Sequence, residues 1–245
     1  MKEIKQEAVG LLVAAQPLRA AVFDRFGIDF CCGGKQTLLD ACEKAGIGTE
    51  SVIAGLAEND ARAAMQDAPD SWLNASLTEL TKHIEQTHHA YLKVELPRLQ
   101  ALAEKVARVH GAKDSRLIEV AAVFSAMKEE IEQHTAKEDN ILFPYMRQLD
   151  QGKGIPRAPF GTVANPVRCM ESEHNDAGQA LINLRVLTDQ YKAPESACSS
   201  WLALLAGLAH LDQDLRTHIH KENSILFPRA IETEANITDA EDKGV

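Results

Sequence analysis

An eleven-residue segment of this chain occurs twice. Residues 134–144 read HTAKEDNILFP, and 84 residues later residues 218–228 read HIHKENSILFP. Each copy has a histidine, a glutamate four positions later, and then the sequence Ile-Leu-Phe-Pro. Residues four apart lie on the same face of an α-helix, so each copy places an imidazole beside a carboxylate. The repeat therefore predicts two related helices that carry the same pair of polar groups.

Apolar residues lead up to both copies with the spacing of one helix face. Steps of three, seven, ten, fourteen and seventeen back from each histidine, and seven forward, meet only apolar residues: Ile131, Met127, Phe124, Val120, Leu117 and Ile141 in the first copy, and Leu215, Leu211, Leu208, Leu204, Trp201 and Ile225 in the second. A surface ion pair is the commoner meaning of this spacing, but the stripe directs both pairs toward a core. Burying these groups without partners costs several kcal/mol, and a metal ion would satisfy both.

Composition indicates an ordinary globular protein. The 245 residues are 45% hydrophobic and 25% charged, enough for one large or two modest domains. The net charge of −10 argues against nucleic acid or an anionic membrane surface as a partner. The longest uncharged run, residues 196–211, is too short to span a membrane, and the acidic N-terminus does not resemble a signal peptide. Five cysteines, an odd number, fit reduced thiols, so we expect a cytoplasmic protein.

Residues 1–60 are predicted to form a small domain of short helices. Pro17 is placed to begin a helix that Gly27 would end, and residues 37–45 should form another that ends at Gly46. The segment between these two helices contains a pair of adjacent cysteines.

The cysteine pair, Cys31 and Cys32, is followed by two glycines and Lys35. Adjacent cysteines are poorly spaced for one tetrahedral zinc. A nearby helix N-terminus and Lys35 should lower the pKa of a thiol here, which favours a reactive pair. The alternative is two small buried residues at a tight turn. We expect the other three cysteines, Cys42, Cys169 and Cys198, to be packing residues.

The rest of the chain predicts a four-helix bundle. We expect a linker at residues 61–73, the bundle at 74–235 and a flexible tail at 236–245. A capping box beginning at Ser76 should start the first long helix, which Pro97 should kink. The four helices are expected at residues 76–109, 115–147, 166–191 and 194–228, with a long loop at 148–165. The fold class is therefore all-α, with two copies of one helical hairpin.

The first helix of each hairpin should supply a histidine at the matching level. His174 precedes His218 by 44 residues and His89 precedes His134 by 45, and both are followed by apolar stripes. His88 competes with His89, because the stripe changes register at this point. The repeat spacing favours His89, with His88 as a neighbour or substitute.

The remaining histidines are expected to play other roles. His83, His210 and His220 fall off the apolar stripes, so we expect them in solvent. His110 should lie at a helix C-terminus, where a cation is favoured.

Six side chains thus converge in the predicted bundle core: His89, His134, Glu138, His174, His218 and Glu222. Inward imidazoles and carboxylates from facing helices hold paired irons in other bundles. The set is not soft enough to require copper(I) or thiolate-bound zinc. With six side chains for two ions, each glutamate should bridge, which leaves two histidines per ion and open positions for a small molecule.

These residues resemble a known family. The bundle resembles the hemerythrin-like domain, and residues 29–36 are similar to the short domain that precedes it in the iron–sulfur cluster repair di-iron proteins, the Repair of Iron Centers family. The resemblance extends from about Leu12 to Arg229. Its specific motifs are residues 30–35, 95–97 and 170–174 and both Ile-Leu-Phe-Pro copies.

The resemblance implies a ligand set and a function. His89, His134, His174 and His218 would be terminal ligands of two non-haem irons, bridged by Glu138, Glu222 and an oxo group. Family members are cytosolic proteins that help restore iron–sulfur clusters damaged by nitric oxide or peroxide. The chain departs from respiratory hemerythrin, which has five histidine ligands, and this weakens an oxygen-carrier interpretation.

The sequence is compatible with two functions. In the first, the protein gives iron to damaged iron–sulfur proteins, with Cys31 and Cys32 as a contact or redox pair. Open iron positions would also allow reduction of nitric oxide as a side activity. In the second, the protein binds or senses a diatomic gas, oxygen or nitric oxide. A sensor is more often fused to an output domain, so we favour repair by a monomer or homodimer.

Overall fold

The computed structural model describes residues 2–63 and 72–242. These residues are helical, apart from loops and one isolated antiparallel bridge between Ala8 and Thr37. The chain divides into two compact units, Met1–Leu80 with Ile219–Val245, and Thr81–His218. Most of the predicted linker, residues 64–71, lies outside the described residues. Within the described ranges, no helix is long and apolar enough to cross a membrane.

Short helices make up the N-terminal part of the chain. They are α1 (Lys2–Gln6), α2 (Val9–Ala15), η1 (Pro17–Arg19), α3 (Ala20–Arg25), α4 (Leu38–Ala45) and α5 (Thr49–Ala63). The Thr37 side chain caps α4 by accepting a hydrogen bond from the backbone N–H of Asp40 at 3.1 Å. Gly46, with φ of +69°, ends that helix as predicted.

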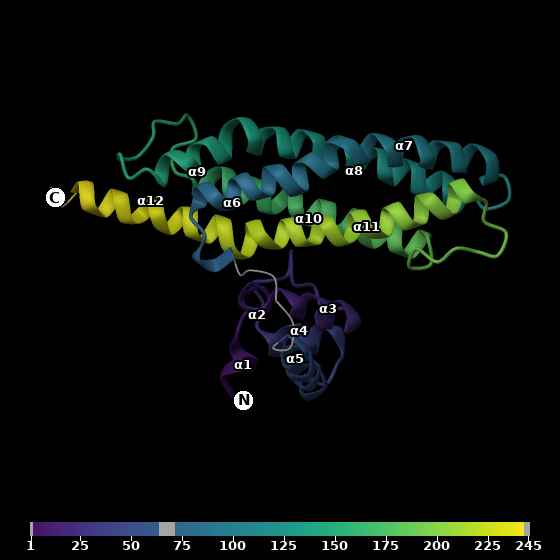
Figure 1. The fold of residues 1–245 in the computed structure, drawn as a ribbon, viewed down its shortest axis with the longest axis horizontal. Helices are drawn as coiled ribbons and strands as arrows, with labels where there is room; N and C mark the ends of the chain where they lie inside the picture. Colours follow the sequence, from purple (N-terminus) through teal and green to yellow (C-terminus); the bar gives the residue numbers. More distant parts are fainter. Residues whose placement is uncertain (1, 64–71, 243–245) are drawn as a thin grey trace. The chain divides into compact units, whose positions relative to one another are not determined.

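Long helices make up the rest, and the predicted four-helix bundle is confirmed. Figure 1 shows α7, α8, α10 and α11 side by side. After the 3₁₀ turn η2 (Trp72–Asn74), the elements are α6 (Leu77–Ile84), η3 (Glu85–His89), α7 (Ala90–His110), α8 (Arg116–Lys137), η4 (Glu138–Leu142), α9 (Phe143–Leu149), α10 (Ala164–Leu187), α11 (Ser199–Lys221), η5 (Glu222–Leu226) and α12 (Phe227–Asp242).

Some helix ends agree with prediction and others differ; the fourth long helix, for example, begins at Ser199 rather than near residue 194. The capping box forms, with Ser76 Oγ accepting from Glu79 N at 3.1 Å and Glu79 Oε2 accepting from Ser76 N at 2.8 Å. The third long helix ends at Leu187, before three consecutive residues with positive φ, 189–191. The fourth does not end near Pro228. Pro228 is the second residue of α12, where a missing N–H is tolerated, and the helix continues to Asp242, into the expected tail.

Apolar side chains from the predicted stripes form the bundle core. The five stripe residues that precede each histidine of the repeat are buried, and so are Leu92, Leu96 and Leu99 after His89. The residues after His174 at the same steps, Ala177, Leu181 and Leu184, are buried as well. The helical periodicity therefore predicted the core of all four helices.

Three π-helical turns change the register of this periodicity. They are η3, η4 and η5, and each begins or ends at a predicted metal ligand. A π turn contains about one residue more than an α turn, so it moves the following side chains to a different face. In η3 this buries both His88 and His89, which explains the register change seen in the sequence.

The prediction that Ile141 belongs to the stripe was wrong. After the π turn η4, Ile141 is 53% exposed, and Leu142 is buried in its place at 2% exposure. The corresponding Ile225 is buried, as predicted. It belongs to η5, which packs against α2 of the same compact unit.

Candidate metal centre

The predicted ligands lie together in two groups. His89, Glu138, His218 and Glu222 form one group, and His134, Glu138, His174 and Glu222 form the other. Within each group, one nitrogen or oxygen atom of every residue lies within 4.8 Å of the others. Both glutamates are 0% exposed, and the four histidines are buried. Each group therefore has two imidazoles, and the two carboxylates are common to both.

The distances at the centre suit shared metal ligands. The Nε2 atoms of His89 and His218 are 3.2 Å apart, and those of His134 and His174 are 3.1 Å apart. Two nitrogens that bind one ion at about 2.1 Å and at a right angle would be about 3.0 Å apart. Oε2 of Glu138 lies 3.4 Å from His89 Nε2 and 3.3 Å from His134 Nε2. Glu138 therefore lies within reach of both groups.

Helical spacing places both glutamates. Glu138 follows His134 by four residues, and Glu222 follows His218 by four, at the point where an α-helix passes into a π turn. The backbone is helical on both sides of each π turn, so histidine and glutamate lie about one turn apart along the same face. The repeated sequence thus builds the same local arrangement twice.

Asp139 orients His89. Its Oδ1 lies 2.6 Å from His89 Nδ1, and its Oδ2 accepts from Lys93 Nζ at 2.9 Å. Burial would raise the pKa of Asp139, but the hydrogen bonds with His89 and Lys93 lower this pKa to about 2. The carboxylate is therefore ionised near neutral pH, and His89 donates from Nδ1. This tautomer leaves the Nε2 lone pair directed toward the centre.

Glu173 has the same relationship to His134. Its Oε2 lies 2.8 Å from His134 Nδ1, and its other oxygen pairs with Lys137. Burial opposes ionisation of Glu173, but the hydrogen bonds from Lys137 and His134 lower its pKa below the usual value. Sequence analysis did not identify Asp139 or Glu173. The sequence pattern that could have revealed them is a carboxylate directly next to a predicted ligand: Asp139 follows Glu138, and Glu173 precedes His174.

His88 is buried but belongs to neither ligand group. Its Nδ1 lies 2.8 Å from Oδ1 of Asp214, and its ring stacks on His218. The structure therefore places His89, rather than His88, with the other predicted ligands.

The donor set fits a metal centre. Two fully buried carboxylates need compensating positive charge, since an ionised group in a core without it is costly. Imidazole and carboxylate together suit first-row cations such as iron, whereas copper(I) prefers thiolate or thioether ligands. The six residues thus provide the charge and the donor types that such a cation requires.

Comparison with known proteins identifies the family. The model of the Hemerythrin HHE cation binding domain matches residues 80–230, and a Domain of Unknown function (DUF542) matches residues 5–60. A relative from Musicola paradisiaca (strain Ech703) is 39% identical over 94% of this chain and 99% of its own length. One from Yersinia pestis (strain Pestoides F) is 38% identical over 95% of this chain and its whole length. Both are named Iron-sulfur cluster repair protein YtfE.

The chain belongs to the hemerythrin-like iron–sulfur cluster repair family. The matched domain is a cation-binding domain, and the buried histidines and glutamates fit its metal site. The resemblance stated from the sequence motifs is confirmed.

In this member of the repair family, the cysteine pair is arranged around Asp29. The sulfur atoms of Cys31 and Cys32 lie 3.8 Å apart. Oδ1 of Asp29 accepts from the backbone N–H groups of Cys31 and Cys32, both at 3.0 Å. One atom from each of these three residues also lies within 4.8 Å of the other two, so they form a further group that could hold a metal ion.

The expected lowering of thiol pKa is wrong for Cys31. The hydrogen bond with Cys32 raises the pKa of Cys31 well above its usual value, and burial and the negative charge of Asp29 raise it further. The sequence pointed to Lys35 and a helix N-terminus as the dominant neighbours. In the fold, the Cys31 sulfur contacts a second thiol, that of Cys32, and the Asp29 carboxylate instead.

The cysteine segment packs on residues that follow His218. Asn223 donates from Nδ2 to the carbonyl oxygen of Cys31 at 3.2 Å. The ring of Phe30 meets that of His220 edge-on, with centroids 5.6 Å apart. His220, which we expected in solvent, is 5% exposed, and burial lowers its pKa to about 4. The helix face that carries His220 was misassigned because the N-terminal segment covers it.

Proposed function

We propose that this protein holds two iron ions and supplies iron to iron–sulfur clusters damaged by oxidative or nitrosative stress. His89 and His218 would bind one ion, and His134 and His174 the other, with Glu138 and Glu222 bridging. The observation that carries the proposal is that two buried ligand groups share both glutamates. When bound, the iron pair would supply exchangeable iron and open positions for nitric oxide or oxygen-derived species.

The names of the relatives support the repair function. The chain covers nearly the whole length of proteins named for iron–sulfur cluster repair. Damaged iron–sulfur proteins are therefore the partners we propose. All five cysteines are thiols, which suits a reducing compartment such as the cytoplasm.

The residues around the centre would prepare it for metal. Asp139 and Glu173 hold His89 and His134 with Nδ1 as donor, so Nε2 can bind a cation without first losing a proton. The side chains of both carboxylates are partly exposed and each is paired with a lysine, Lys93 or Lys137. Two of the four histidines are thus held in position by carboxylates that reach the protein surface, while Glu138 and Glu222 are fully buried.

Cys31 and Cys32 are proposed as the contact or redox pair for iron transfer. Asn223, which bonds the Cys31 carbonyl, directly follows Glu222 in the sequence. The two sulfur atoms are close, and Asp29 adds an oxygen ligand beside them. The raised pKa of Cys31 keeps its thiol protonated until a cation or a partner displaces the proton.

The proposal is tested by metal analysis and by cluster repair. Protein purified without added metal should contain two irons per chain and show the near-ultraviolet absorption of an oxo-bridged pair. The loaded protein should restore activity to an iron–sulfur enzyme inactivated by nitric oxide, and the Glu138→Leu variant should not. A colourless zinc-filled protein would overturn the iron assignment. Nitric oxide binding without any reactivation would favour the gas-binding function.

A further inference from the structure

Two cysteines outside the Cys31–Cys32 pair are exposed. We expected Cys169 and Cys198 to be packing residues, and for both the prediction was wrong, although Cys42 is buried as expected. The two exposed thiols differ in the group each one contacts, and this difference allows their reactivities to be compared within one molecule.

Cys169 contacts a carboxylate. Its sulfur lies 3.4 Å from Oε1 of Glu173. Burial and the negative charge of Glu173 both raise the pKa of Cys169. A thiolate is therefore disfavoured at this position, and the thiolate is the nucleophilic form of cysteine.

Cys198 contacts an imidazole instead. Its sulfur lies 3.2 Å from Nε2 of His110. A neutral imidazole at this distance can accept the thiol proton and leave a thiolate beside an imidazolium, as in cysteine–histidine nucleophile pairs. His110 is the last residue of α7, and this end of a helix favours a positive charge.

The start of α11 favours the opposite charge. Cys198 immediately precedes Ser199, and its carbonyl accepts from Leu202 N at 2.9 Å, so it lies at the helix N-terminus. This end of a helix favours a negative charge. The C-terminus of α7 thus lies beside the N-terminus of α11. An imidazolium at His110 and a thiolate at Cys198 would each carry the charge that its helix end favours.

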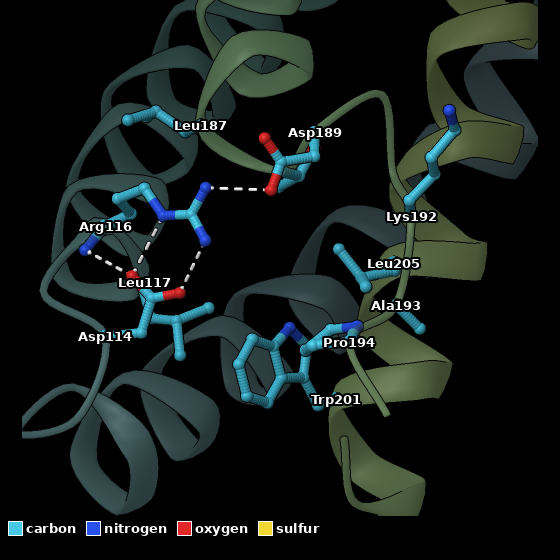
Figure 2. Close-up of a pocket in the computed structure, with 11 residues that line it drawn as sticks. Asp114, Arg116, Leu117, Leu187, Asp189, Lys192, Ala193, Pro194, Trp201 and Leu205 are labelled. Atoms are coloured by element: carbon cyan, nitrogen blue, oxygen red, sulfur yellow. Dashed lines mark hydrogen bonds and ion pairs between the residues drawn. The ribbon is translucent and has the colours of Figure 1, made fainter. Parts of the chain in front are cut away.

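Trp201, the residue against which His110 packs, lines a cavity of about 170 Å³ that neither Cys198 nor His110 itself lines. The ring centroids of Trp201 and His110 are 5.2 Å apart. Figure 2 shows Arg116 held by Asp114 and Asp189, with Leu117 beside Asp114, and Trp201 next to Pro194. Apolar and charged groups line this cavity together.

We propose that Cys198 and His110 form a thiol–disulfide exchange site for small disulfides such as oxidised glutathione. His110 takes the proton of Cys198, and the thiolate attacks one sulfur of the disulfide. A sulfur–sulfur bond forms to Cys198 as the bond within the disulfide breaks. The departing thiolate takes the proton from His110, so the products are a mixed disulfide on Cys198 and one small thiol. The disulfide is the oxidant, and the step does not involve the metal centre.

The test measures modification of each cysteine in the full-length protein. The protein is incubated with oxidised glutathione at neutral pH, and the adduct at each cysteine is quantified by peptide mass spectrometry over time. Cys198 should react about tenfold faster than Cys169, because an imidazolium can stabilise a thiolate at Cys198, whereas the negative charge of Glu173 disfavours one at Cys169. Equal rates at the two exposed thiols would overturn the proposal.

Variants of His110 separate its chemical role from its packing role. His110→Gln should slow the reaction of Cys198 by about tenfold and leave that of Cys169 unchanged. His110→Phe retains an aromatic ring against Trp201 and should slow it equally. Full reactivity of Cys198 in either variant would overturn the assignment of His110. Cys198→Ser and Cys169→Ser identify the modified peptides, and unchanged helical content and iron content confirm that each variant is folded.

Discussion

The imidazole of His88 lies parallel to that of His218, with ring centroids 5.3 Å apart and an interplanar angle of 3°. Asp214, one helical turn before His218, holds His88 through Nδ1 at 2.8 Å. His88, held by Asp214, therefore packs against the face of the His218 ring, although His88 lies outside both ligand groups. Of the two adjacent histidines of η3, His89 thus belongs to a ligand group, whereas His88 packs against the ligand His218.

This relationship predicts different results for the two adjacent histidines. His88→Leu should weaken iron binding by about tenfold, the scale of losing a residue that orients a ligand. His89→Leu should remove iron from the site altogether, because it deletes a proposed ligand. Chelator competition followed by metal analysis measures both. If His88→Leu lost all iron while His89→Leu retained it, the assignment of the two residues would be reversed.

Replacing either shared glutamate should empty both iron positions. Glu138→Leu and Glu222→Leu each remove a carboxylate that belongs to both ligand groups. Metal analysis should find little iron in either variant. Glu132→Leu is the matched control, since Glu132 lies on α8 with an exposed side chain paired to Lys128, and it should retain two irons. One iron at full occupancy in Glu138→Leu would contradict a bridging role.

The double variant Cys31→Ser and Cys32→Ser should retain iron but transfer it poorly. Neither sulfur belongs to the two buried ligand groups, and serine preserves the size of both side chains. Iron content is measured first, and reactivation of a damaged iron–sulfur enzyme second. Loss of iron from this variant would instead place the thiols at the metal site, and unimpaired reactivation would remove them from the transfer step.

A buried charge cluster should stabilise the bundle independently of metal. Arg185, Arg216 and Tyr191 all contact the Asp212 carboxylate, which is almost fully buried. Asp212→Asn should lower the free energy of unfolding by about 3 kcal/mol, because it leaves two arginines without their charge partner. Denaturant unfolding at neutral pH measures the loss.

The contribution of Asp212 should depend on pH. Burial alone would raise its pKa, but the hydrogen bonds from Arg185 and Tyr191 lower it below the usual value. A carboxyl with a lowered pKa stabilises the fold fully above its unfolded pKa of about 3.9, and this stabilisation is lost as pH falls through the folded value. The difference between wild type and Asp212→Asn should therefore shrink below about pH 4. A difference that stayed constant to lower pH would contradict this origin.

The spacing of residues along the chain was enough to predict much of the fold and of the candidate site. His134 and Glu138 share a helix face because they are four residues apart, and this holds whatever surrounds the helix. The apolar residues before them select the buried face in the same way. The 84-residue repeat then implies that the second pair, His218 and Glu222, is arranged alike, so the six candidate ligands could be named from periodicity and repetition.

Two kinds of feature could not be predicted from the sequence pattern: the positions of the π turns, and contacts between segments that are far apart in the chain. The π turn in η4 moves Ile141 into solvent, and the one in η3 buries His88 beside His89. Such a turn adds one residue to a helix, and a periodic count along the chain has no means of placing it. Cys31 and His220 illustrate a second reason. Burial shifts the pKa of both side chains, and it depends on segments that approach from elsewhere in the chain. Asn223 lies at the Cys31 carbonyl and Phe30 at His220, and only packing brings these groups into contact.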